Sequence, residues 1–324
     1  MDSLLFAINA VMPIILMVAV GYFLRRIALV NADFVKMANK LVFRVFLPVM
    51  LFLNVYNIDA SMNIGFTYIL FAIAVIAVIY VVAIPITALV TKKEDRRAPV
   101  IQAVFRSNYA LIGSPLAEAF FGAEGAAVAA LLSAFSIPLY NVLAVVTFAI
   151  FGGGKVSVKK ILKGIVTNPL IIGVAFGAVM LLLKNLLSSA GVTTTLADIT
   201  PLYKLLTYLS GMATPLALIV LGAQFEFSAI PGMKREIIFS TLARIVVVPV
   251  AAIAIAIATG LFGGAHIAAF VALFGTPVAV STVPMTQELG GDTALAGQLV
   301  VWTTLFSGVT IFLFSFVLKA MGIF

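Results

Sequence analysis

Long apolar runs, each about 20 residues and separated by short polar stretches, constrain this chain more than any other feature. An α-helix needs about 20 apolar residues to cross the hydrocarbon of a bilayer. The alternating pattern of a transmembrane β-barrel does not dominate the sequence. Hydrophobic residues make up 63% of the 324 positions and charged residues only 10%, which is far from the composition of a water-soluble fold. The sequence therefore predicts an all-α integral membrane protein.

Short polar stretches divide the chain into ten expected transmembrane spans, with nine as the alternative count. The expected spans cover residues 3–24, 41–57, 65–90, 99–121, 125–150, 161–183, 202–223, 237–259, 265–287 and 295–319. No long polar segment is left over for a soluble domain. We therefore expect residues 1–324 to form one transmembrane unit.

Basic residues gather in alternate loops between these spans. One set of loops carries Arg25, Arg26, Lys36, Lys40, Lys92, Lys93, Arg96, Arg97, Lys155, Lys159, Lys160, Lys234 and Arg235. The other set holds little beyond Lys184. A net charge of +8 would suggest nucleic acid as the partner of a soluble protein, but this distribution follows the positive-inside rule. We expect no nucleic-acid partner, cytoplasmic basic loops and both termini outside.

Proline positions repeat between the two halves of the chain. The pairs are Pro13 with Pro169, Pro48 with Pro215, Pro85 with Pro249, and Pro115 with Pro284. Gly21 and Gly177 follow the prolines of the first pair at the same spacing of eight residues. These matches predict two five-helix repeats, residues 1–153 and 154–324. Because each repeat has an odd number of helices, the second copy enters the membrane inverted, which is typical of transporters.

The fourth and ninth expected spans are the most interrupted. They read FRSNYALIGSPLAEAFFG at 105–122 and FGTPVAVSTVPMTQELGG at 274–291. Proline frees backbone groups that hydrocarbon cannot satisfy, so such a break persists only where it meets protein or lines a cavity. An ordinary proline kink is the alternative for one helix, but two breaks at matching repeat positions favour a site. A half-helix that begins at Ser114-Pro115 would direct free N–H groups toward an anion.

Arg106 is the most informative polar residue inside a span. Burying a guanidinium costs at least about 2.5 kcal/mol on insertion scales, so it indicates a wet cavity in which it could clamp a carboxylate. An ion pair with Glu118 or Glu226, or snorkelling to the inner surface, is an equal alternative. Asn108 offers donors and an acceptor at the break, and its alternative role is repair of the kinked backbone.

Other polar residues receive different interpretations. Glu118 and its repeat counterpart Gln287 indicate a proton or cation relay, or else the wetter end of a half-helix. We interpret Arg44 and Arg244 as anchors at the cytoplasmic interface, because long basic side chains reach it readily from helix ends. Asn54, Tyr140 and Asn141 lie deeper in their spans and are of more interest.

The chain lacks the residues that several kinds of chemistry need. It has no cysteine and one histidine, His266, so we expect no thiol chemistry and no metal site. It has no Walker motif, no catalytic triad and no paired carboxylates at catalytic spacing, so we expect no enzyme, no catalytic residues and no cofactor. The stretch FGGGKVS at 151–157 lacks the spacing of a phosphate loop, and we interpret it as the linker between the repeats.

Four motifs resemble the auxin efflux carrier family, in particular its bacterial members of the malonate or malate carrier type. They are PIILMVAVGYFLRR, LVFRVFLPVMLF, FRSNYALIGSPLAEAFFG and AVSTVPMTQELGGDTALAGQLVVWTTLFS, and the similarity covers essentially the whole chain. The resemblance implies ten helices in two inverted repeats, a scaffold and a transport domain, and an organic-anion site where broken helices four and nine cross. It also implies a homodimer, as in plant relatives, and a bacterial inner-membrane location.

The resemblance implies two site residues, one in the fourth span and one in the fifth. Asn108, seven residues before Pro115, matches the asparagine that contacts the substrate carboxylate in the plant carriers, and Tyr140 matches a tyrosine of their pocket. The third span lacks the acid and lysine of the plant carriers, and Leu51 replaces their serine. The coupling ion and the substrate therefore do not carry over. The long plant loop is also absent, so an aromatic hormone is not the implied substrate.

The sequence thus predicts a secondary transporter of small organic anions, such as malonate or malate, with an alternating-access, elevator-like mechanism. The expected substrate-binding residues are Asn54, Arg106, Ser107, Asn108, Ser114, Pro115, Tyr140, Thr276, Pro277, Ser281 and Thr282. The alternatives are a sodium-coupled symporter of the bile-acid-carrier type, with Glu118 and Gln287 as first ligands, and a non-transporting sensor or channel. The expected partners are a small carboxylate, the lipid bilayer and a second copy of the chain.

Overall fold

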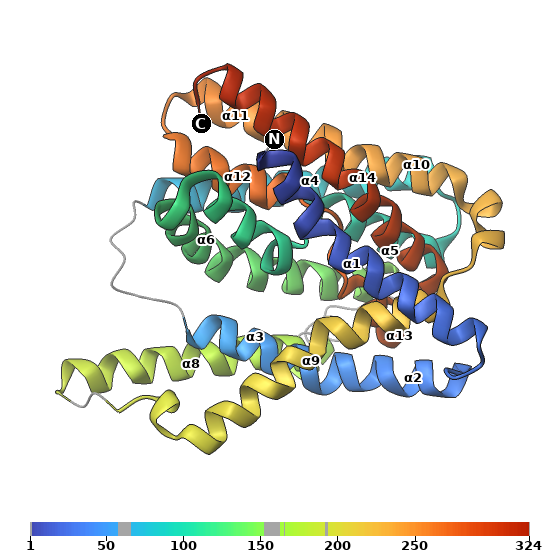
Figure 1. Cartoon of the computed structure of the whole chain (residues 1–324), viewed down its shortest axis with the longest axis horizontal. Coiled ribbons are helices and arrows are strands. Elements are labelled where there is room, and N and C mark those ends of the chain that lie inside the picture. Colours follow the sequence, from blue (N-terminus) through green and yellow to red (C-terminus); the bar gives the residue numbers. More distant parts are fainter. Residues whose placement is uncertain (1, 58–65, 152–162, 165, 192–193, 324) are drawn as a thin grey trace.

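The computed structural model describes residues 2–57, 66–151, 163–164, 166–191 and 194–323 (Figure 1), and their regular structure is helical. The first half contains α1 (Asp2–Arg26), α2 (Ala32–Leu41), η1 (Val42–Phe46), α3 (Leu47–Tyr56), α4 (Phe66–Val90), α5 (Glu94–Phe105), η2 (Tyr109–Gly113) and α6 (Ser114–Phe151). The second half contains α8 (Pro169–Ser189), η3 (Leu196–Asp198), α9 (Thr200–Gln224), η4 (Phe227–Met233), α10 (Lys234–Leu242), η5 (Ala243–Val247), α11 (Val248–Thr259), α12 (Gly264–Gly275), α13 (Thr282–Leu289) and α14 (Thr293–Ala320). The all-α prediction is confirmed for these residues.

Among the described residues, seven helical stretches are long and apolar enough to cross a membrane. They are Ala32–Tyr56, Phe66–Val90, Glu124–Phe151, Pro169–Ser189, Thr200–Gln224, Phe227–Thr259 and Thr293–Ala320. The protein is therefore a multi-pass membrane protein. α5 and α12, the starts of the interrupted fourth and ninth spans, are each only 12 residues long, too short to cross alone. The count of ten stays a prediction.

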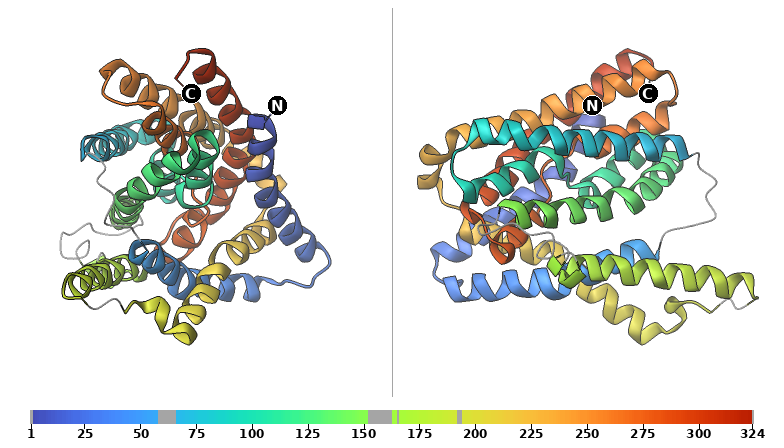
Figure 2. Two further views of the ribbon diagram at one scale, coloured as in Figure 1. Left: turned by 60° about the vertical axis from the view of Figure 1, so that its left-hand side comes forward. Right: turned by 180° about the vertical axis from the view of Figure 1, so that it is seen from behind.

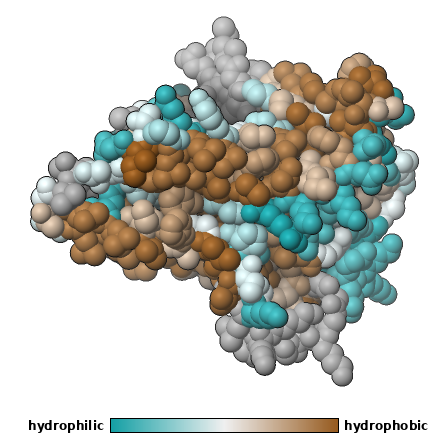
Figure 3. Space-filling model, turned by 90° about the horizontal axis from the view of Figure 1, so that it is seen from below, coloured by the Kyte–Doolittle hydropathy of each residue, from teal (hydrophilic) through white to brown (hydrophobic). Residues whose placement is uncertain are grey.

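The helices form two bodies (Figures 1 and 2). We call α1, α2, η1, α3, α8 and α9 the panel, because α1 packs along α9, α3 packs along α8, and α3 also contacts α9. We call the remaining helices, α4 to α6 and α10 to α14, the crossing body, and α1 of the panel also packs against α14 of this body. Figure 3, which views the molecule from the panel side, shows brown apolar surface along the helices and teal residues gathered toward the right. Such apolar outer surface suits contact with lipid.

Three wide π-helical turns each end two residues before a proline. η1 ends at Phe46 before Pro48, η2 ends at Gly113 before Pro115, and η5 ends at Val247 before Pro249. Proline lacks an N–H and its ring crowds the preceding turn, so the helix widens there instead of stopping. α6 is kinked at Phe121 and Gly122, and the kink separates its short first part from the longer second part.

Glycines allow the panel helices to touch backbone to backbone. A Cβ atom at Gly21 of α1 would collide with the carbonyl oxygen of Ile219 in α9. A Cβ atom at Gly177 of α8 would lie 2.7 Å from the carbonyl oxygen of Phe52 in α3. Both glycines of the sequence pair therefore lie where two panel helices approach closely, and a side chain at either position would force the helices apart.

Candidate functional site

Two broken helices cross inside the crossing body. α5 ends at Phe105 and α12 ends at Gly275, and the extended segments that follow pair through an antiparallel bridge between Ser107 and Val278. The backbone N–H of Asn108 donates to the carbonyl oxygen of Pro277 at 2.8 Å. Each break thus satisfies part of the other's backbone, which is how non-helical backbone is tolerated at membrane depth. The predicted interruption of these two stretches is confirmed.

Arg244 caps the C-terminal ends of both broken helices. Its side chain is fully buried, at 0% exposure, and its guanidinium donates only to backbone carbonyl oxygens at these ends. The acceptors are Val104 (3.1 Å), Thr276 (3.0 Å), Leu273 (3.3 Å) and Phe274. The interpretation of Arg244 as an interface anchor is wrong, because η5 directs this side chain into the crossing and leaves none of it exposed.

Arg106 follows α5 directly and immediately precedes Ser107, the residue that pairs with Val278. It is only 5% exposed, so it does not snorkel to the surface. Its guanidinium donates to neutral side-chain groups. They are Gln102 Oε1 (3.0 Å), Asn141 Oδ1 (2.8 Å), Ser281 Oγ (2.9 Å) and Met285 Sδ.

No carboxylate pairs with Arg106 among the described residues. Glu118 and Glu226, the two acids considered as its partners, are both exposed. The ion-pair alternative for Arg106 is therefore not what the structure shows. A buried guanidinium that is held only by neutral oxygens and a sulfur keeps its full charge available to an anion.

A cavity of about 60 Å³ lies between the two bodies, beside Arg106. The crossing body contributes its polar wall, with Arg106, Ser107, Asn108, Ile137, Tyr140, Asn141, Ala279, Val280 and Ser281. The panel contributes a largely apolar wall, with Leu47, Met50, Leu51, Leu170, Ala213, Thr214 and Ala217. Since one water needs about 10–15 Å³ by this kind of measure, the cavity accepts a group of a few heavy atoms.

Asn108 presents an unsatisfied donor in this cavity. The residue is 4% exposed, and its Nδ2 has no hydrogen-bond partner in the structure. Buried amide N–H groups are almost always paired, so an unpaired one that lines a cavity indicates a ligand or water acceptor. The backbone of Asn108, not its side chain, repairs the break. Nearby, Ser107 Oγ donates to Tyr140 Oη at 3.4 Å.

The structure brings together Arg106, Ser107, Asn108, Tyr140 and Ser281 of the predicted site residues. Thr276, Pro277 and Thr282 belong to the ninth-span break but do not line the cavity, and the Thr276 hydroxyl donates to the Ala272 carbonyl at 3.0 Å. Asn54 is exposed on α3, so it does not lie at this cavity. Ser114 and Pro115 begin α6, but their side chains lie outside the described residues.

Two residues that hold Arg106 are not among the expected substrate-binding residues. Gln102 lies one helical turn before Arg106 on α5, a spacing that could have revealed it. Asn141 comes from the long second part of α6, and its contact with Arg106 depends on the folding of two distant segments. The sequence signal for Asn141 is its depth in an apolar span, which does not reveal this contact.

The predicted relay pair is not brought together. Glu118 is exposed on α6, whereas Gln287 of α13 contacts the panel. Asn39 Nδ2 donates to Gln287 Oε1 and to Gln224 Oε1 (3.4 Å), and Gln224 Nε2 donates to Gln287 Oε1 at 3.0 Å. Next to this amide trio, Arg44 of η1 pairs with Glu288 at 3.3 Å. These contacts join panel and crossing body at the ends that carry the basic loops.

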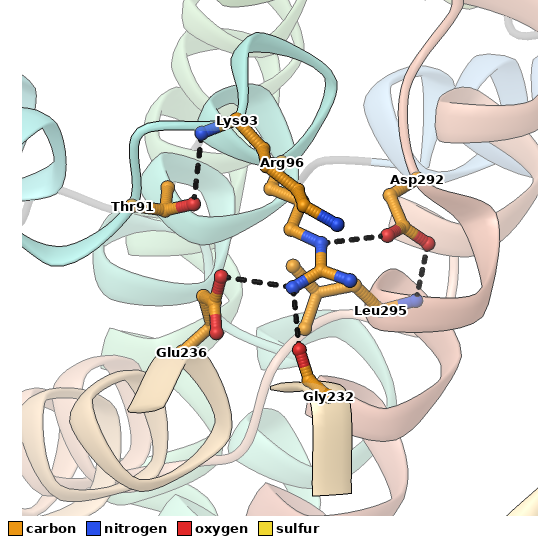
Figure 4. Close-up of polar contacts among 7 residues, drawn as sticks. All are labelled: Thr91, Lys93, Arg96, Gly232, Glu236, Asp292 and Leu295. Atoms are coloured by element: carbon orange, nitrogen blue, oxygen red, sulfur yellow. Dashed lines mark hydrogen bonds and ion pairs between the residues drawn. The ribbon is translucent and has the colours of Figure 1, made fainter. Parts of the chain in front are cut away.

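A separate polar cluster ties the crossing body together at the same end (Figure 4). Arg96 at the start of α5 donates to Glu236 of α10 at 3.0 Å and to Asp292 before α14 at 2.9 Å. It also reaches the carbonyl oxygen of Gly232 at 2.8 Å. Asp292 in turn caps α14 through Leu295 N–H at 2.9 Å. The cluster fixes three helix ends relative to one another.

Among the described residues, no group of three or more His, Cys, Asp or Glu side chains could hold a metal ion. A family model described as "Membrane transport protein" matches residues 6–154 and 153–315, most of the chain. No curated protein matches the chain.

Proposed function

The chain belongs to the membrane transport protein family, of the auxin efflux carrier type, and from that membership we propose that it is a secondary carrier of small organic anions. Members of this family are membrane transporters rather than enzymes. The proposed cargo is a small carboxylate of the malonate or malate kind, carried across a bacterial inner membrane. The proposed mechanism is alternating access of the cavity between panel and crossing body.

The observation that carries this proposal is the polar wall of the cavity. Arg106 supplies a buried positive charge without a carboxylate partner, and Asn108 supplies an unpaired N–H donor beside it. A carboxylate would give Arg106 a negatively charged partner and would give the Asn108 N–H group an acceptor oxygen. The small volume of the cavity supports a compact acid over an aromatic one.

The proposed architecture is ten helices in two inverted repeats, residues 1–153 and 154–324. The glycine contacts support it, because Gly21 meets Ile219 and Gly177 meets Phe52. Ile219 and Phe52 each lie four residues after the paired proline of their own helix. The contact of the first helix with the seventh is therefore matched, residue for residue, by the contact of the sixth with the second. An inverted repeat requires such reciprocal contacts.

The proposed motion separates the two bodies, in an elevator-like or rocking manner. Among the described residues, the side-chain hydrogen bonds from panel to crossing body lie at the basic-loop end. By the positive-inside rule this end is cytoplasmic and both termini are outside. Opening the cavity to the cytoplasm would then break the amide trio and the Arg44–Glu288 pair, while the Arg96 cluster stays intact.

We also propose a homodimer, on the strength of the family resemblance. The mass of the purified protein in detergent, after the detergent contribution is subtracted, tests this point. A mass of two chains agrees with the proposal, and a mass of one chain contradicts it.

Malonate counterflow in proteoliposomes tests the function. Wild-type protein should exchange external labelled malonate for internal malonate, with competition by malate, and Asn108→Ala should abolish exchange while its thermal unfolding stays near that of the wild type. Asn54→Ala is the matched control, because this asparagine is exposed and away from the cavity. Citrate, an aromatic acid and an amino acid as competitors define the substrate class, and parallel runs with and without sodium test the symporter alternative. Full exchange by folded Asn108→Ala would refute the site assignment.

A further inference from the structure

We propose that Arg244 determines the anion specificity of the carrier site without touching the ligand, by neutralising the two helix ends that stop at the crossing. This inference rests on the proposed carboxylate site and assigns it a second, hidden cation. The role differs from that of Arg106, which lines the cavity itself.

The first step is the charge of the two helix ends. The last carbonyl groups of an α-helix lack intrahelical partners, and the C-terminus carries roughly half a negative charge. α5 and α12 both end at the crossing, at Phe105 and Gly275. Two such ends together amount to roughly one negative charge. They would repel an anion held in the segments that follow them.

The second step is the position of Arg244. Its acceptors come from the final residues of α5 and α12, namely Val104, Leu273 and Phe274, and from Thr276 just beyond α12. One guanidinium thus contacts both helix ends, at distances of 3.0 to 3.3 Å for three of the four bonds. Its single positive charge matches the combined charge of the two ends, and no acidic side chain among the described residues pairs with it.

The third step is the effect on Arg106. This residue is the C-cap of α5, and its backbone N–H donates to the carbonyl oxygen of Gln102 in the last turn at 2.9 Å. Without Arg244, the carbonyl ends would be negative partners close to the Arg106 charge and would compete with the ligand for it. With Arg244 in place, the Arg106 charge stays available for the ligand. Electrostatic effects of this kind are large because the crossing is buried.

A purely structural role for Arg244 is the competing explanation, since its bonds also hold the two helix ends together. The two roles differ in what they require of a substitute. Charge neutralisation requires a cation at this place, whereas bridging requires a planar fork of donors, which lysine lacks. Arg244→Lys keeps the charge and loses the fork, and Arg244→Gln keeps hydrogen-bond donors and loses the charge.

The test is equilibrium binding of malonate and of its uncharged diamide to the purified full chain in detergent. We expect Arg244→Gln to bind malonate at least about tenfold more weakly than the wild type, with the weak diamide signal unchanged. We expect Arg244→Lys to stay within about threefold at neutral pH. Arg44→Gln is the control, because Arg44 is an exposed arginine paired with Glu288. Folded Arg244→Gln with wild-type malonate affinity would overturn the inference.

If Arg244→Gln does not fold, the pH dependence of malonate binding by Arg244→Lys tests the inference. A buried ammonium gives up its proton far more readily than a guanidinium, so malonate affinity of Arg244→Lys should fall as the pH is raised from about 7 to about 10. The wild type should change much less, although it contains the same neighbouring Tyr140 and Arg106. Parallel pH profiles would overturn the inference. A wild-type chain that binds no carboxylate would instead contradict the proposed function on which the inference rests.

Discussion

Two arginines lie on either side of the helix crossing and differ in what they bind. Arg244 is held by four backbone carbonyl oxygens, whereas Arg106 is held by side-chain oxygens and a sulfur. Both are buried, and neither has an acidic partner among the described residues. Burial and charge alone therefore do not identify a ligand-binding cation. The hydrogen-bond partners distinguish the two residues, because Arg244 contacts only backbone of the fold, whereas two acceptors of Arg106, Asn141 and Ser281, line the cavity.

The largest expected effect is on the stability of the protein, which should depend more on Arg244 than on Arg106. Arg244→Met leaves several buried carbonyl groups without partners, so we expect it to lower the free energy of unfolding by at least about 3 kcal/mol. Arg106→Met removes bonds to side chains that can repack or bind water in the cavity, so its effect should be smaller. Thermal unfolding of both variants in detergent measures the difference. Equal losses would remove the distinction between a structural and a ligand-binding arginine.

An intermediate effect follows from the partners of Arg106, which can be changed by mutation while those of Arg244 cannot. Asn141→Leu removes the oxygen that holds Arg106 Nη2 at 2.8 Å. The guanidinium then loses part of its fixed orientation, and we expect carboxylate affinity to fall by about threefold to tenfold. Binding isotherms for the variant and the wild type measure this ratio. An unchanged affinity would show that Arg106 does not need this partner.

The smallest effect belongs to a third arginine, Arg44. Its side chain is 58% exposed, and it pairs with Glu288 at 3.3 Å. Exposed ion pairs contribute about 0–1 kcal/mol, so Arg44→Gln should leave both unfolding and carboxylate affinity nearly unchanged. The same two assays measure the unfolding and the carboxylate affinity of Arg44→Gln, and a tenfold loss of affinity would place Arg44 at the site after all.

Much of the crossing could be predicted from the sequence, because proline and glycine act locally. The prolines marked the interrupted stretches, and Arg106 and Asn108 were recognisable as polar residues inside an apolar run. Arg244 was misinterpreted because its distance from the polar end of its span suggested an interface anchor. The sequence does not show that η5 widens the helix there, nor that two broken helices end against this side chain.

Contacts between distant segments were the part that local patterns could not supply. Asn141 meets Arg106 only because the second part of α6 packs beside the end of α5. Asn54 looked similar to Asn108 as an asparagine deep in an apolar span, yet it faces outward from α3. A helix places neighbouring residues on different faces, and which face meets the crossing body depends on tertiary packing.

Carboxylate binding by Arg106→Gln tests the central claim most directly. Titration of malonate into purified wild type and Arg106→Gln, with thermal unfolding measured on the same samples, separates binding from folding. The account predicts at least about a tenfold loss of affinity in a variant that still unfolds cooperatively near the wild-type temperature. Wild-type affinity in folded Arg106→Gln would contradict it, because the cavity would then bind its anion without Arg106, the one cationic side chain that lines it among the described residues.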